Sequence, residues 1–75
     1  MSKTKATPAD VAAVTALVDN AAQFSDDLVA RSLVDALRGQ VLDRGEGLSV
    51  YGKRSVAMML RKIGADDLAD DLGHG

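Results

Sequence analysis

The hydrophobic positions of this chain recur every three or four residues in three stretches, which is the spacing of amphipathic helices. The first stretch follows a strong helix start, because Thr7 can cap a helix, Pro8 suits its first position and Asp10 meets the positive end of its dipole. We therefore predict a helix over residues 8–22, with Phe24 in the junction that follows. Its apolar face comprises Val11, Val14, Leu17, Val18 and Ala21.

The second stretch begins after Ser25-Asp26-Asp27, which repeats the start signal. Gly39 costs a helix interior about 1 kcal/mol relative to alanine, so this helix is predicted either to end there or to continue to Asp43. Gly45-Glu46-Gly47 then forms the clearest break in the chain. The apolar positions of the second helix are Leu28, Val29, Leu33, Ala36, Leu37 and Val41.

The third stretch lies beyond this break. Residues 48–51 are either a short extended piece or a turn in which Ser49 caps the next helix, and helical spacing resumes from about Lys53. Gly64 is well placed as a left-handed residue at the end of that helix. Ala65-Asp66-Asp67 then opens a short last helix. The inward positions of these two helices are Val56, Met59, Leu60 and Ile63, followed by Leu68, Ala69 and Leu72.

Together these elements predict an all-α fold, a small four-helix bundle with two longer antiparallel helices and two shorter C-terminal helices. We expect a disordered N-terminal tail over residues 1–6, a single helical domain over residues 7–72 and a flexible C-terminal tail over residues 73–75. The predicted core consists of Val11, Val14, Leu17, Val18, Phe24, Leu28, Leu33, Leu37, Val41, Val56, Leu60, Ile63, Leu68 and Leu72.

Composition makes this core thin. A single domain of 75 residues lies near the lower limit of unaided stability, and the chain has no cysteine and only two aromatic residues. Its many alanines bury little area each, so completion of the core by a second copy is a reasonable expectation, and we consider a homodimer. No apolar run has the roughly 20 residues of a membrane span, and no signal-peptide pattern follows Lys3 and Lys5. We expect a cytoplasmic protein, and the Ala, Val, Asp, Arg and Gly bias is typical of a GC-rich bacterial or phage genome.

Residues suited to catalysis or cofactor binding are scarce. The only histidine, His74, lies in the expected C-terminal tail, and a nucleophile–base pair would have to combine a serine with Lys53. Residues 47–53 have the spacing of a phosphate-binding P-loop, but no strand precedes them and Arg54 stands where that motif needs a serine or threonine. We therefore predict no enzymatic activity, no cofactor and no metal site.

Charge is unevenly distributed near the C-terminal end, although the formal net charge is only −2. Helix 53–62 has four basic and no acidic side chains, and the next helix has four aspartates. In one interpretation these two helices partly neutralise each other or simply face water. In the other, an outward stripe of Arg54, Met58 and Arg61 docks an acidic protein partner or a phosphate backbone. The candidate partner-binding residues are then Lys53, Arg54, Met58, Arg61 and Lys62.

The sequence therefore favours a small non-enzymatic protein–protein interaction module that acts as an adaptor, inhibitor or regulatory subunit. The alternative is a nucleic-acid-binding transcriptional regulator that uses the basic helix 53–62. In a helix-turn-helix arrangement the second helix would enter the major groove, yet here that helix carries four aspartates, which phosphates repel. A protein is thus a more suitable partner than a nucleic acid, and no contact with a membrane is expected.

Overall fold

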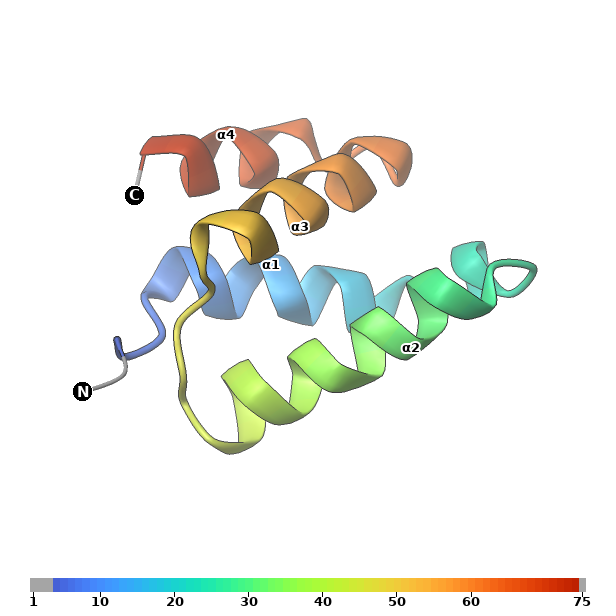
Figure 1. Ribbon diagram of the computed structural model, residues 1–75. Coiled ribbons are helices and arrows are strands. Elements are labelled where there is room, and N and C mark those ends of the chain that lie inside the picture. Colours follow the sequence, from blue (N-terminus) through green and yellow to red (C-terminus); the bar gives the residue numbers. More distant parts are fainter. Residues whose placement is uncertain (1–3, 75) are drawn as a thin grey trace.

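The computed structural model describes residues 4–74, without the side chain of His74, and every regular element in that range is a helix (Figure 1). The predicted all-α class is thereby confirmed. The four α-helices are α1 (Pro8–Asp19), α2 (Leu28–Leu37), α3 (Val50–Lys62) and α4 (Asp66–His74). A 3-10 helix, η1 (Ala21–Phe24), joins α1 to α2, and a π-helix, η2 (Arg38–Asp43), follows α2 without a break.

Short polar side chains determine where the first three α-helices begin. Thr7, Asp27 and Ser49 each accept a hydrogen bond of 3.0 to 3.1 Å from the backbone amide three residues later. Each cap satisfies an amide that the first helical turn leaves without a partner. The cap at Ser49 decides between the two predictions for residues 48–51, because α3 begins at Val50 rather than near Lys53.

The two glycines at predicted helix ends behave differently. Gly64 has a φ of +82°, and beyond it the amide of Ala65 donates to the carbonyl of Leu60 at 2.8 Å, which confirms the predicted left-handed C-terminal residue. The second helix does not end at Gly39. Its helical path continues to Asp43, but the hydrogen bonding there widens to the π pattern.

The helix α1 is the centre of the arrangement. It packs against α2, η2, α3 and α4, and the most extensive contact between α-helices is that of α3 with α4. In Figure 1, α2 lies below α1, and α3 and α4 lie above it. By contrast, the backbones of α2 and α3 barely approach each other, and only side chains lie between the two helices.

The core occupies the faces that surround α1. Of the predicted core, Val18, Leu33, Ile63 and Leu68 are only half-buried, although all four pack against the buried cluster. The buried hydrophobic residues are Ala13, Val14, Leu17, Phe24, Ala30, Val34, Leu37, Val41, Leu48, Val56, Met59, Leu60, Ala69 and Leu72.

Two predicted core residues are exposed, and those predictions were wrong. Val11 is 40% exposed because the buried face of α1 follows Asp10, Ala13, Val14 and Leu17, about 100° around the helix from Val11. Leu28 is 73% exposed. The buried face of α2 instead follows Ala30, Val34, Leu37 and Val41, which have their own spacing of four, three and four residues.

At both ends of the described range, ordered backbone extends into the segments that were expected to be tails. Residues 4–6 are paired with the loop after η2: Ala6 donates to the carbonyl of Gly45 at 2.8 Å, and Gly47 donates to that of Thr4 at 2.7 Å. The backbone of α4 continues to His74, beyond the expected boundary at residue 72. Residues 1–3 and 75 lie outside the described part of the chain.

Candidate interaction surface

An apolar groove separates α2 from α3, and we call it the α2–α3 groove. Its volume is about 180 Å³. The groove exists because both helices pack on α1 rather than on each other. The residues that line it are Val29, Ala30 and Leu33 from α2, Ser55, Met58 and Met59 from α3, and the charged residues Asp27 and Lys62.

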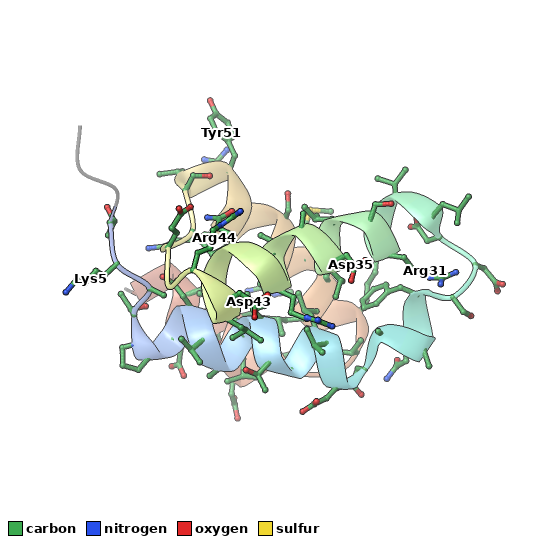
Figure 2. All side chains as sticks on the ribbon, turned by 90° about the horizontal axis from the view of Figure 1, so that it is seen from below. Lys5, Arg31, Asp35, Asp43, Arg44 and Tyr51 are labelled. Atoms are coloured by element: carbon green, nitrogen blue, oxygen red, sulfur yellow. The ribbon has the colours of Figure 1, made fainter. Side chains whose placement is uncertain are left out.

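Large apolar side chains along this groove are exposed to solvent. Val29 is 79% exposed and Met58 is 64% exposed. On α3 the residues Tyr51, Ser55, Met58 and Lys62 follow at intervals of four, three and four, so they share one stripe of the helix. Figure 2 shows that Tyr51, which is 79% exposed, points away from the rest of the protein at the start of α3. Exposed apolar side chains gathered in this way are typical of a contact surface.

The structure divides the five predicted partner-binding residues between two grooves. Met58 and Lys62 line the α2–α3 groove. Lys53, Arg54 and Arg61 instead line a second groove, between α3 and α4, whose volume is about 170 Å³. Arg54 is exposed, so α3 presents a ridge on which basic and apolar side chains meet.

One ion pair joins the basic helix to the acidic one. Arg61 Nη2 lies 3.3 Å from Asp70 Oδ1, and both side chains are more than half exposed. An ion pair in that position contributes at most about 1 kcal/mol to stability, because water screens it. The ion pair matters more for binding, because Arg61 is less available to a partner while it is paired with Asp70. Among the described residues, no ion pair involves Lys53, Arg54 or Lys62.

A second, buried polar cluster joins the start of α1 to the loop before α3. Asp10 is only 2% exposed, and its Oδ2 accepts hydrogen bonds from the amides of Thr7 at 3.1 Å and Leu48 at 3.5 Å. Its Oδ1 is buried without a hydrogen-bond partner in the described part of the chain. The side chain of Gln40 donates to the carbonyl of Gly47 at 2.8 Å. Because each of these bonds ties the loop or the start of α1 in place, the cluster has a structural role.

Gly47 fits this cluster only because it has no side chain. A Cβ at this position would lie 2.9 Å from the carbonyl oxygen of Lys5 and 3.2 Å from that of Thr4, both backbone atoms that have to move. We expect Gly47→Ala to lower the free energy of unfolding by about 1–3 kcal/mol, the usual cost of overpacking. Urea denaturation followed by circular dichroism measures this change.

A matched control for that substitution exists at Gly39. A Cβ there meets no atom within 4 Å, and the residue has no positive φ. Gly39→Ala is therefore expected to raise the free energy of unfolding by about 0.5–1 kcal/mol, because alanine loses less backbone entropy on folding. Equal stabilities of the two variants would contradict the close approach of Gly47 to residues 4 and 5.

Within residues 4–74, no three His, Cys, Asp or Glu side chains are placed to hold a metal ion. In the P-loop-like segment, Ser49 caps α3, Leu48 is buried and Gly52 lies in the first turn of the helix. The described helices include none that is both long enough and apolar enough to cross a membrane.

Sequence reasoning missed most of the groove. It placed Val29 and Leu33 on the apolar face of the second helix and assigned no role to Tyr51. A usable signal was present in Leu28-Val29-Ala30, because three consecutive apolar residues cannot all face the same core from one helix. Searches of protein-family models, curated proteins and solved structures found no match for this chain.

Proposed function

We propose that this protein is a small non-enzymatic protein–protein interaction module, a four-helix bundle with α1 and α2 antiparallel, which acts as an adaptor, inhibitor or regulatory subunit. The observation that supports this proposal is the α2–α3 groove, in which Val29 and Met58 are mostly exposed although they are large and apolar. Leaving such groups in water is unfavourable, and a partner that covers them recovers about 25 cal/mol for each Å² of apolar surface buried.

A protein partner accounts for these features better than a nucleic acid does. A phosphate backbone that approaches Lys53, Arg54 and Arg61 from the groove between α3 and α4 would also approach the aspartates of α4, and Asp70 already lies 3.3 Å from Arg61. The negative charges of these aspartates repel a phosphate backbone and weaken its binding. The lining of the α2–α3 groove is mostly apolar, and Lys62 is its one basic residue among those described, so the groove offers little to a phosphate backbone. The exposed apolar side chains of the α2–α3 groove therefore favour a protein partner over a nucleic acid.

The test is affinity capture from the source organism with the wild-type protein and with the double variant Val29→Asp/Met58→Asp. Each substitution places a charge in the apolar contact, so binding is expected to fall by at least about tenfold. Capture is quantified by mass spectrometry. The captured partner is then purified, and its binding to the wild-type protein and to the double variant is measured. Circular dichroism checks that the variant is folded, which we expect because both side chains are mostly exposed.

The matched control is Leu28→Asp, which changes an equally exposed apolar residue that does not line the α2–α3 groove. Partner capture should survive this change. The proposal is wrong if the double variant retains the same protein as the wild type, or if the wild type retains only nucleic acid.

A further inference from the structure

We infer that the occupant of the α2–α3 groove is an amphipathic helix of another protein, with apolar anchors flanked by acidic residues. This inference rests on the proposed function and specifies the partner of the same groove. It depends on three properties of the surface, namely its dimensions, the charge of its two sides and the poor fit of a second copy.

The dimensions of the surface suit a short helix. The α3 residues that line the groove run from Ser55 to Lys62, which is seven residue steps, or about 10 Å at 1.5 Å per residue, and matches about two turns of a docked helix. Tyr51 extends the exposed stripe of α3 by about one further turn. The apolar surface along it includes Met58 and Met59, whose flexible side chains adapt to the anchors of a helix. Apolar anchors at intervals of three and four residues would lie along the groove, as in other helix-in-groove complexes.

The two sides of the groove differ in charge. The α3 side belongs to a helix with four basic and no acidic residues, of which Lys62 lines the groove and Arg54 lies next to the Tyr51–Met58 stripe. On the α2 side, the N-cap residue Asp27 lines the groove and repels other carboxylates. Arg31 and Asp35 each follow a groove residue by two positions, which turns them about 200° around the helix and away from the groove. Carboxylates on the partner therefore make their most favourable electrostatic contacts when they face α3.

A second copy of this chain fits less well. A two-fold dimer through the groove brings the same surface of each copy together, so the two basic α3 helices would approach each other. The acidic α4 of another copy has suitable chemistry, but α4 and the groove are different surfaces. Such a head-to-tail contact does not close into a dimer and would build chains that grow with concentration.

The experiment selects peptides from a displayed library of 14-residue helices. Leucine is fixed at three anchor positions spaced by four and three residues, and the other positions sample Glu, Lys, Gln and Ala. Selection on the immobilised wild-type protein, with depletion on Val29→Asp/Met58→Asp, should enrich Glu over Lys beside the anchors. The best peptide is then synthesised, and its Kd is measured by fluorescence anisotropy.

Charge reversal tests Lys62, which lines the α2–α3 groove, together with Arg54, which lies beside the Tyr51–Met58 stripe and lines the groove between α3 and α4. Arg54→Glu/Lys62→Glu should raise the Kd of the selected acidic peptide by about tenfold, because two favourable charge contacts become repulsive. The control Arg31→Glu/Arg38→Glu changes the net charge by the same amount on exposed residues outside the groove. It should leave the Kd within about twofold.

Three results would overturn the inference. These are a library that yields no groove-dependent peptide, a selected pool without enrichment of Glu, and light scattering that shows a dimer dissociated by Val29→Asp/Met58→Asp. If capture of the natural partner still depends on Val29 and Met58 in any of these cases, only the acidic helix is excluded and the proposed function stands. If capture does not depend on them, the proposed function fails as well.

Discussion

The substitution Leu60→Ala is expected to lower the free energy of unfolding by about 2–5 kcal/mol, the range for removing a fully buried leucine side chain. Leu60 is 0% exposed and lies on the face of α3 that joins the central core. Because a domain this small has little stability to lose, we expect the variant to be largely unfolded at 37 °C. Thermal melts and urea titrations followed by circular dichroism measure the change.

A control with identical chemistry is Leu28→Ala. The same atoms are removed there from a side chain that is 73% exposed, so the effect should stay within about 0.5 kcal/mol. This pair of variants also distinguishes the core predicted from the sequence, which contains both leucines, from the core of the structure, which contains only Leu60. Similar losses for both variants would show that the described face of α2 is incorrect.

The second large effect is expected from Asp10→Ala. The substitution removes the acceptor of the Thr7 and Leu48 amides and leaves these donors without a partner in a largely buried cluster, at about 1–3 kcal/mol. It also removes a negative charge from the first turn of α1, which contributes about 0.3–1 kcal/mol through the helix dipole. We therefore expect a total loss of about 1–4 kcal/mol in urea denaturation.

Asp19→Ala provides the comparison for Asp10→Ala. Asp19 is exposed and lies at the end of α1, where the dipole disfavours a negative charge, so its removal should be neutral or slightly stabilising. Hydrogen exchange adds a local measure, because the amide of Gly47 should exchange faster once Asp10 no longer holds the loop. If Asp10→Ala unfolds at the same urea concentration as the wild type, Asp10 does not hold the loop.

These two effects belong to different parts of the molecule from the α2–α3 groove. Leu60 is fully buried, and Asp10 joins the start of α1 to the loop before α3. Neither residue lines the groove. Loss of partner binding in Leu60→Ala or Asp10→Ala would therefore reflect unfolding, whereas loss in Val29→Asp/Met58→Asp with an intact circular-dichroism spectrum reflects the surface itself.

The local signals of the sequence predicted the helices well, because those signals act over three or four residues. The cap at Thr7 is present, and Gly64 has the left-handed conformation expected of it. Ser49 caps α3, which was one of the two alternatives that the sequence left open for residues 48–51. The second helix was harder to predict. Its continuation through Gly39 as a π-helix involves hydrogen bonds of wider spacing, which propensity at a single glycine does not indicate.

The buried faces were predicted less well, because hydrophobicity alone does not say which of two adjacent stripes a neighbour covers. On α1 the carboxylate of Asp10 is buried, whereas Val11 is 40% exposed. The reason is a long-range bond, from the amide of Leu48 to a side chain 38 residues earlier. On α2 the small residue Ala30 is buried while Val29 faces the groove, since α1 covers one side of the helix and α3 stays apart from it.

The amino-acid sequence by itself determined the helical class, the starts of α1 and α2 and the separation of a basic helix from an acidic one, because each depends on neighbours along the chain. Only the tertiary structure decided that Met58 and Lys62 meet Val29 across a groove while Arg61 is paired with Asp70. It also decided that residues 4–6 pair with the loop at 45–47. The physical reason is that α1 packs on every other α-helix, which sets the faces that remain for a partner.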